Sequence, residues 1–431
     1  MNFLKKQSPV RIISLGFALV ILIGSVLLSL PCSIRDGVTL RYIDALYMST
    51  SAVCVTGLLT VDAGDTFTPL GQFFLGMLIQ VGGLGVTAVG TGVILAMGKK
   101  INLKARNLIR EAGNLDSGKG VIRFIRLVFL TTVTFELAGA ALSFLVFRKN
   151  FPPLKAAGVS LFHSVASFNN SGFDILGGGQ NLIPYQDDIL LNLVTCALVI
   201  FGGIGFLVIR EVIAKRFRWK KLSMHAKVVL FMSLVLTAAG TVLLKLTEDI
   251  TWMGAFFTSV SARTAGFSTF PLGSFSGAGL LTVIVLMVIG ASPGSTGGGI
   301  KTTTCYVLFE GIRSSATNTS EKAFRYAVPA DAFRKAAVIT LLAIGIVLSG
   351  TYILVILEPG VPFLDALFEM SSAFGTAGLS TGISAGLCDA AKILTILIMF
   401  IGRLGPLTIA SLWYFTKGER VSYPEGNIAI G

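Results

Sequence analysis

The chain has 431 residues, of which 53% are hydrophobic and 13% are charged, and its mean hydropathy is +0.80. Soluble domains carry roughly 25% charged residues, so this composition excludes an ordinary soluble protein and indicates a membrane protein. The net charge of +13 does not indicate nucleic-acid binding, because most Lys and Arg residues fall near the chain ends and in three loops between apolar stretches. That distribution indicates membrane topology and contact with lipids.

A bilayer core of roughly 30 Å needs about 20 mainly apolar residues per helix. Eight stretches meet this requirement: 10–30, 70–97, 123–146, 187–213, 226–246, 278–309, 336–357 and 390–415. The first is too long for a signal peptide and is expected to be a spanning helix. Between the members of each pair lies an apolar stretch too short to span, such as 42–54 or 158–169, which predicts a re-entrant half-helix.

The predicted fold is therefore an all-α membrane protein with eight spanning helices. These form four pseudo-symmetric repeats of helix, re-entrant pore loop and helix around one central pore. The predicted repeats cover residues 1–97, 98–213, 214–312 and 313–431. The positive-inside rule places both termini and the basic loops between repeats in the cytoplasm, so the half-helices enter the plasma membrane from outside.

One short phrase occurs four times, once in each predicted repeat. The copies are SAVCVTGLLT (51–60), ASFNNSGFDIL (166–176), SARTAGFSTF (261–270) and SAFGTAGLSTG (372–382). Each of these glycine phrases runs from small residues into one glycine that is followed by Leu or Phe. The four glycines are Gly57, Gly172, Gly266 and Gly378. We expect the four phrases to close around one axis and to line a pore with backbone carbonyls.

The chemistry of the phrase suits potassium. A potassium ion that sheds water needs oxygen ligands without a full opposing charge, and a ring of backbone carbonyls supplies them. Glycine adopts the positive φ that aims consecutive carbonyls at one axis, and the C-terminal end of each half-helix adds roughly half a negative charge. The candidate selectivity-filter residues are Val55, Thr56 and Gly57; Asn170, Ser171 and Gly172; Thr264, Ala265 and Gly266; and Thr376, Ala377 and Gly378.

None of the phrases contains the longer TVGYG run of tetrameric potassium channels, so we expect weaker discrimination than in those channels. Arg263, just before Gly266, is expected to pair with Glu136 or Glu369.

The third repeat is predicted to depart from the pattern, because GASPGSTGGGIKTTT (290–304) interrupts its inner helix with glycines and a proline. Non-helical backbone at this depth is tolerated only where it is buried or lines a water-filled cavity. We expect a gate below the filter, although packing without function is the alternative. A nucleotide-binding P-loop does not fit, because Ile300 separates Gly299 from Lys301. The candidate gate residues are Gly290, Ser292, Pro293, Gly294, Ser295, Thr296, Gly297, Gly298, Gly299, Lys301 and Arg403.

Arg403 lies in FIGRLGPLT (400–408), which aligns with the GGLG (82–85) and GGIG (202–205) stretches of the first two inner helices. Such small residues usually let membrane helices pack closely. An arginine at the bilayer centre almost always faces the protein interior or a cavity. Two interpretations remain open: a paired arginine that locks two helices together, or an electrostatic element in the permeation path.

The sequence gives no indication of an enzyme. The cysteines show no close pairing and indicate neither a disulfide framework nor a metal site. His163 and His225 lie in different regions, away from any evident nucleophile. We expect no covalent cofactor.

The four phrases, the PGSTGGGIKTTT break, the FIGRLGP helix and the YPEGNIAIG tail (423–431) together resemble the KtrB/TrkH superfamily of potassium transporters, and the length looks like the KtrB branch. The resemblance implies potassium uptake, often stimulated by Na⁺, through a homodimer with one pore per subunit. It also implies that the glycine-rich loop is the gate, that Arg403 sits in the path, and that a KtrA-type cytoplasmic ring with nucleotide-binding domains regulates the pore.

An alternating-access monovalent cation porter is the nearest alternative, because porters also use broken helices near the membrane midplane. Porters usually show two inverted halves, whereas this chain repeats one phrase four times, which favours a pore.

Overall fold

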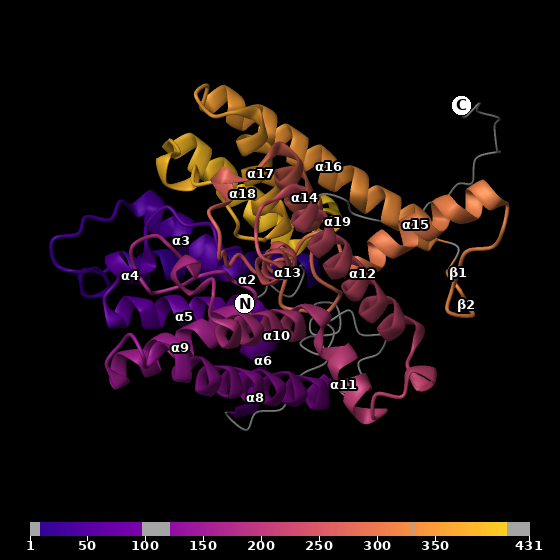
Figure 1. The fold of residues 1–431 in the computed structure, drawn as a ribbon, viewed down its shortest axis with the longest axis horizontal. Helices are drawn as coiled ribbons and strands as arrows, with labels where there is room; N and C mark the ends of the chain where they lie inside the picture. The colour runs from indigo at the N-terminus through magenta and orange to yellow at the C-terminus, as the bar shows by residue number, and fades with distance from the viewer. Residues whose placement is uncertain (1–8, 97–120, 330, 412–431) are drawn as a thin grey trace, which may run out of the picture.

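The computed structural model describes residues 9–96, 121–329 and 331–411. The structure is mainly α-helical (Figure 1). Within those ranges the only sheet pairs β1 (Lys322–Ala323) with the antiparallel strand β2 (Tyr326–Ala327), so the all-α prediction missed one small hairpin. The hairpin and the adjacent helix α15 lie at one end of the molecule, away from the crowded centre (Figure 1).

A long helix, a shorter helix and a third helix follow one another four times along the chain. The four units are α2 (Pro9–Leu28), α3 (Tyr42–Cys54) and α5 (Pro69–Leu84); α8 (Val121–Phe147), α9 (Pro153–Phe168) and α10 (Ile189–Ile204); α12 (Met224–Thr247), α13 (Trp252–Ala262) and α14 (Gly277–Val288); and α16 (Ala332–Leu357), α17 (Phe363–Gly375) and α18 (Asp389–Leu404). Further short elements are α4 (Ala63–Thr66), η1 (Pro31–Ser33), η2 (Ile183–Tyr185), η3 (Trp219–Lys221), η4 (Leu272–Ser274) and η5 (Ser384–Gly386).

The short second helices confirm the half-helices predicted over 42–54 and near 158–169. Each has an identifiable start. Pro153 stands at the first position of α9, where a missing N–H costs nothing. Thr251 caps α13 by accepting a hydrogen bond from Gly254 N, and Asp44 places an acidic group in the first turn of α3.

Four helices of the described ranges are long and apolar enough to cross a membrane: Val10–Leu28, Ile122–Phe147, Met224–Thr247 and Ala332–Leu357. Two bent pairs raise that number to six if each pair is one span. Each of the four long helices carries a strongly exposed leucine, such as Leu130 at 65% and Leu341 at 71% exposure. Apolar side chains that remain exposed in this number suit a lipid environment.

The third helices of the first, second and fourth units end at a break. The sequence predicted continuous inner helices over 70–97, 187–213 and 390–415, and this prediction was wrong. The chain bends by 102° after α5 and by 97° after α10. Gly85, Gly205 and Gly405 form the breaks, with φ of 85°, 98° and 90°. The helices that follow are α6 (Val86–Ala96), α11 (Phe206–Ala214) and α19 (Pro406–Ser411).

The physical reason is that a positive φ ends an α-helix, and glycine adopts it without a Cβ penalty. The predicted break in the third unit is confirmed, because α14 ends at Val288 and α15 (Thr302–Thr317) begins only at Thr302. It differs from the other breaks in its length.

Glycines on the inner helices bring those helices directly against the ends of the short helices. A Cβ on Gly82, Gly202 or Gly402 would collide with the carbonyl oxygen of Val53, Phe168 or Phe374, respectively. These contacts confirm the close-packing interpretation of the GGLG and GGIG stretches. They also show that Gly402 is the counterpart of Gly82 and Gly202, which makes Arg403 the counterpart of Gly83 and Gly203.

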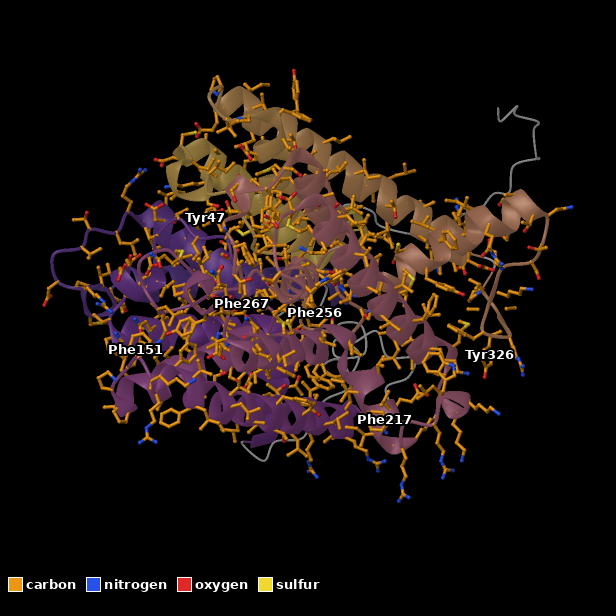
Figure 2. The ribbon with its side chains drawn as sticks, viewed as in Figure 1. Tyr47, Phe151, Phe217, Phe256, Phe267 and Tyr326 are labelled. Atoms are coloured by element: carbon orange, nitrogen blue, oxygen red, sulfur yellow. The ribbon has the colours of Figure 1, made fainter. Side chains whose placement is uncertain are left out.

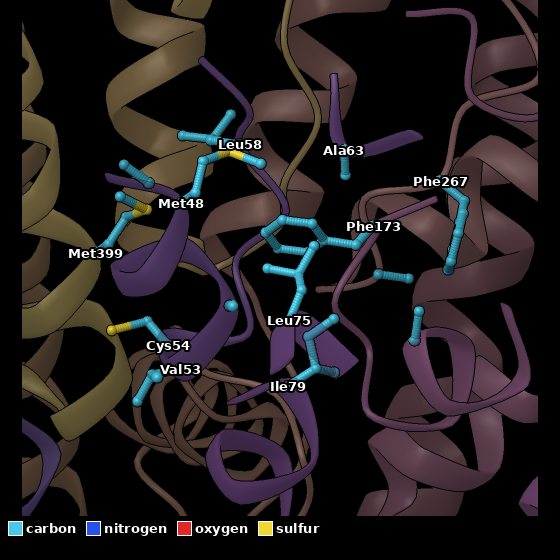
Figure 3. Close-up of a cluster of buried hydrophobic side chains, with 14 of the residues drawn as sticks. Met48, Val53, Cys54, Leu58, Ala63, Leu75, Ile79, Phe173, Phe267 and Met399 are labelled. Atoms are coloured by element: carbon cyan, nitrogen blue, oxygen red, sulfur yellow. The ribbon is translucent and has the colours of Figure 1, made fainter. Parts of the chain in front are cut away.

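The residue after each phrase glycine is a buried hydrophobic residue. Leu58, Phe173, Phe267 and Leu379 are all at most 2% exposed. Phe267 lies in the interior of the molecule, whereas Phe217 and Tyr326 lie at its edge (Figure 2). Phe173 lies close to Leu75 of α5, and Met48 of α3 lies beside Met399 of α18 (Figure 3). Buried hydrophobic side chains therefore anchor each phrase in the core.

A buried ion pair closes the seam between the fourth unit and the first. Lys392 of α18 and Asp44 of α3 lie 2.6 Å apart, and both side chains are buried. A second pair, Arg41 with Asp389, joins the same two helix starts but is exposed.

Replacing Lys392 with methionine should lower the Tm of the purified protein by roughly 10 °C, because removing one partner of a buried ion pair costs about 3–5 kcal/mol. Arg41→Gln is the matched control, since an exposed pair contributes at most about 1 kcal/mol. Size-exclusion thermostability assays in detergent measure both shifts. Equal Tm shifts in the two variants would show that the buried Asp44–Lys392 pair contributes no more stability than the exposed Arg41–Asp389 pair.

Candidate cation pathway

The four glycine phrases share one backbone conformation. The first and third candidate residues of each phrase have positive φ: Val55 and Gly57 (56° and 99°), Asn170 and Gly172 (58° and 67°), Thr264 and Gly266 (83° and 77°), and Thr376 and Gly378 (49° and 81°). A left-handed conformation is costly for a β-branched residue, by roughly 1–2 kcal/mol. Three β-branched residues nevertheless adopt it, and strain of this kind gathers at functional sites.

Hydrogen bonds to the ends of the short helices turn the chain at each phrase. Thr56 N donates to Ser51 O (2.8 Å), Ser171 N to Ala166 O (2.9 Å) and Ala377 N to Ser372 O (2.9 Å). In the third phrase Ala265 N donates to Ser261 O (2.8 Å). The N–H groups of the phrases therefore point back toward the helices.

The structure brings the four phrases together in a closed ring. A Cβ on Gly57 would lie 2.5 Å from Ser171 O, one on Gly172 would lie 2.8 Å from Ala265 O, and one on Gly266 would lie 2.8 Å from Ala377 O. A Cβ on Gly378 would collide with Thr56 O, which returns to the first phrase. Each glycine thus touches the carbonyl of the next phrase. A side chain at any of the four positions would displace backbone.

Most carbonyl oxygens of the ring have no protein donor among the described residues. Of the twelve backbone carbonyls of the candidate filter residues, only Gly172 O accepts a hydrogen bond from a described residue, and its donor is Asn181 Nδ2 (3.1 Å). The twelve residues are buried. Buried backbone carbonyls are almost always paired with protein, water or an ion. This ring therefore offers converging oxygens to a partner that is not protein.

The loop between α14 and α15 lies against the same ring. Its neck is closed by a parallel bridge between Ile289 and Ile300. Gly298 N donates to Thr376 Oγ1 (2.9 Å), and Thr296 Oγ1 donates to Phe168 O (3.3 Å). A Cβ on Gly297 would collide with Thr264 Oγ1. The loop thus contacts the second, third and fourth units at the inner ends of their phrases.

The helix break in the second unit holds the other side of the loop. Ser292 N donates to Gly203 O (3.0 Å), and Thr296 N donates to Gly202 O (3.2 Å). Phe206 N, freed at the start of α11, donates to Gly294 O (3.1 Å). The break at Gly205 therefore supplies the partners that a buried irregular loop needs.

Arg403 joins the loop to the first unit. Its guanidinium donates to Thr296 O of the loop and to Gly82 O of α5, with a further contact to Gly83 O at 3.2 Å. Lys301 Nζ donates to Gly297 O (2.7 Å) and Gly298 O (3.3 Å) within the loop. In the described part of the chain neither cation lies within ion-pair distance of a carboxylate. Arg403 does lock separate segments together, but it does so through carbonyls.

A cavity of about 300 Å³ adjoins the loop and both cations. Its polar side chains are those of Lys301, Arg403, Ser295, Thr87 and Thr408, and Gly85 and Gly294 contribute backbone. Apolar residues of α2, α6 and α8 complete its walls. The positive charges of Lys301 and Arg403 disfavour a cation in this cavity. This geometry therefore suits a site that limits the passage of cations.

The structure corrects the expected partners of Arg263. Arg263 Nη1 donates to Ser233 O (2.9 Å) on α12, and neither Glu136 nor Glu369 contacts it. Glu136 instead accepts a hydrogen bond from Asn169 (3.1 Å), and Glu369 accepts one from Ser380 (2.8 Å). The prediction was wrong because each carboxylate is bonded within its own unit, Glu136 in the second and Glu369 in the fourth, whereas Arg263 is bonded to α12 of the third unit.

Sequence reasoning missed two polar contacts near the ring. Asn181 lies in an outer loop and reaches Gly172 O, and Asn169 at the end of α9 donates to Gln80 of α5 (2.8 Å). Asn181 belongs to no motif, and Asn169 lies within the second phrase (166–176) but was not among its candidate filter residues. The YPEGNIAIG tail (423–431) lies outside the described residues, as does the basic loop 98–113.

Comparison with known proteins identifies the relatives of this chain. It is 36% identical to Ktr system potassium uptake protein B of Bacillus subtilis, over 98% of this chain and 97% of the relative. It is 35% identical to the potassium/sodium uptake protein NtpJ of Enterococcus hirae, over 99% of this chain and 98% of the relative. The fold matches the crystal structure of the potassium transporter TrkH from Vibrio parahaemolyticus with a TM-score of 0.75 at 19% identity, over 95% of this chain and 86% of that one.

Residues 10–416 match the family described as TrkH, cation transport protein. The members are transport proteins rather than enzymes, which agrees with the sequence prediction, and the apolar helices make this chain a multi-pass membrane protein. The match spans nearly all of the chain and includes all four phrases, the 290–301 loop and Arg403. The chain belongs to the TrkH family of cation transport proteins.

Proposed function

We propose that this protein takes up potassium ions across the plasma membrane through a filter made of the backbone carbonyls of the four phrases. The observation that carries the proposal is the closed ring of buried carbonyls, of which only Gly172 O has a donor among the described residues. Carbonyl oxygens in such a ring replace the hydration shell of potassium. The relatives named as potassium uptake proteins transport the same ion that this chemistry suits.

The proposed membrane topology has eight spanning segments in four repeats, with boundaries at residues 97, 213 and 312 and with both termini in the cytoplasm. The order of elements supports it, since each unit follows a long helix with a shorter second helix and then a third helix. The bent pairs α5–α6 and α10–α11 act as single spans in this arrangement. The short helices then enter from outside and end near the midplane, and their C-terminal ends stabilise a cation by the helix dipole.

The 290–301 loop is the proposed gate beneath the filter. Its backbone N–H groups donate to Thr376 Oγ1, Gly202 O and Gly203 O, and Arg403 ties it to α5, so these contacts hold the loop in place. Passage requires the loop to leave these partners. The loop's glycines give it the conformational freedom to do so.

The proposal includes a homodimer with one pore per subunit and a KtrA-type cytoplasmic ring with nucleotide-binding domains. The similarity to proteins named as members of a Ktr system supports a partner subunit. Na⁺ is proposed as an activator, in line with the potassium/sodium uptake protein among the relatives. An alternating-access porter is the second candidate, supported by the broken helices near the ring.

Rubidium uptake into vesicles that hold the purified protein tests the proposal. We expect saturable uptake down a rubidium gradient without any Na⁺ gradient, and stimulation by equal Na⁺ on both sides. A porter that couples the two ions would need the Na⁺ gradient. Absence of uptake above protein-free vesicles, with correctly folded protein, would overturn the proposed function.

A further inference from the structure

Asn181 lies in an outer loop and, among the described residues, is the one that donates to a carbonyl of the ring. It follows Gly177, Gly178 and Gly179, which all have positive φ, and its own φ is 50°. Asparagine is among the few non-glycine residues that tolerate this conformation. The loop thus presents the Asn181 side chain toward the second phrase, where its Nδ2 lies 3.1 Å from Gly172 O.

The orientation of the amide follows from its partners. Leu182 N (2.9 Å) and Ser268 N (3.1 Å) both face Asn181 Oδ1. Backbone N–H groups can only donate, so they require the oxygen of the amide on their side. The NH₂ group must therefore face Gly172 O, which can only accept.

Asn181 also links two neighbouring phrases. Ser268 follows the third phrase glycine by two residues, and its carbonyl accepts a hydrogen bond from Leu182 N (3.1 Å). The same loop thus binds the exit of the third phrase and the glycine of the second. A movement of the third phrase at Ser268 would therefore shift the second phrase at Gly172, and the reverse.

This contact makes the ring unequal at its glycine layer. In the part of the chain that the structure describes, the carbonyls of Gly57, Gly266 and Gly378 have no protein donor, whereas Gly172 O has one. A carbonyl that already accepts an N–H presents less negative potential to an ion. Its direction is also fixed by the amide.

We propose that Asn181 is a specificity-determining positioning residue, which holds the Gly172 carbonyl and so weakens the cation field of the outermost filter layer. The inference rests on the proposed function, because it concerns the same ring. A weaker field favours the larger and more easily dehydrated potassium ion over sodium. The asymmetry of one layer therefore contributes to discrimination without any charged side chain.

The test compares Asn181→Gly, Asn181→Asp and wild type in vesicles. Glycine keeps the positive φ without strain and removes the amide. Aspartate keeps the acceptor for Leu182 and Ser268 but cannot donate to Gly172 O when ionised. Gln180→Ala, a change at the neighbouring exposed side chain, is the matched control.

Uptake is measured with the stimulating Na⁺ concentration present throughout, so that further Na⁺ reports competition at the filter. Both Asn181 variants should lower the added Na⁺ concentration that halves rubidium uptake by about threefold or more, because a free fourth carbonyl strengthens the field at this layer. The apparent KM for rubidium should fall by about twofold, with Vmax unchanged. Gln180→Ala should match wild type. A wild-type result for Asn181→Asp beside a changed Asn181→Gly would overturn the proposal, since the tie to Ser268 would then be the relevant contact. Loss of Vmax in both variants would also overturn it.

Cation-dependent thermal stability of the purified proteins is the second readout. In both Asn181 variants, the Na⁺ concentration that gives half of the stabilisation should fall relative to the K⁺ concentration that does so. An unchanged ratio contradicts the role of Asn181. If wild-type vesicles take up no rubidium, the proposed function fails by itself; if they do and the variants match them, only the role of Asn181 fails.

Discussion

Replacing Gly378 with serine should raise the apparent KM for rubidium uptake by at least about tenfold. Gly378 has φ of 81°, and a Cβ there would collide with Thr56 O and lie 2.9 Å from the Cα of Gly57. A left-handed serine costs roughly 1–2 kcal/mol before any collision, and about 1.4 kcal/mol corresponds to a factor of ten. The serine also pushes the Thr56 carbonyl out of the ring.

Substitutions at two other glycines of the same outer segment separate backbone strain from collision with the ring. Gly382 has φ of 107° but no neighbour within 4 Å of a built Cβ, so Gly382→Ser carries the backbone strain without the collision. Gly386→Ser carries neither. We expect nearly normal uptake from both. If Gly382→Ser impairs uptake as much as Gly378→Ser does, strain in the loop rather than the carbonyl ring explains the loss.

Replacing Arg403 with alanine should increase the maximal rate of rubidium uptake by roughly tenfold while lowering the Tm. A unit charge within about 8 Å of a passing cation costs about 2 kcal/mol at an effective dielectric constant of about 20. The substitution removes that charge and also frees the 290–301 loop from α5. Orphaned carbonyls at Thr296 and Gly82 should reduce stability by about 1–3 kcal/mol.

Arg403→Lys separates charge from bridging, because lysine keeps the charge but lacks the planar fork that reaches two segments. An uptake rate near wild type in Arg403→Lys would assign the effect to charge, and a raised rate would assign it to release of the loop. Arg313→Ala is the control, since Arg313 pairs with Glu310 on α15. Failure of Arg403→Ala to assemble, with no folded fraction, would support a purely structural arginine.

The local features of the chain were the most predictable. The half-helices at 42–54 and 153–168, the four phrase glycines and the break after α14 all follow from apolar length and from glycine or proline content. These signals are local because hydrophobic length and backbone freedom belong to a few consecutive residues.

The breaks at Gly85, Gly205 and Gly405 were not predicted, because glycines are frequent in membrane helices, where they usually let helices pack closely. At Gly205 the bend is needed where the 290–301 loop arrives, since Phe206 N donates to Gly294 O. The bend at Gly205 thus depends on a contact with a segment that is distant in the sequence. No pattern in the residues around Gly205 predicts that contact.

The sequence by itself determined that this is a membrane protein, that four similar phrases recur, and that Arg403 replaces a small residue of the inner helices. Only the tertiary structure decided that the phrases meet in one ring and that Arg403 bonds to carbonyls of two other segments. It also decided that, among the described residues, eleven of the ring's carbonyls have no donor while Gly172 O has Asn181. The physical reason is that donors, acceptors and close approaches are properties of pairs of segments. Which segments meet is settled by packing over the whole chain.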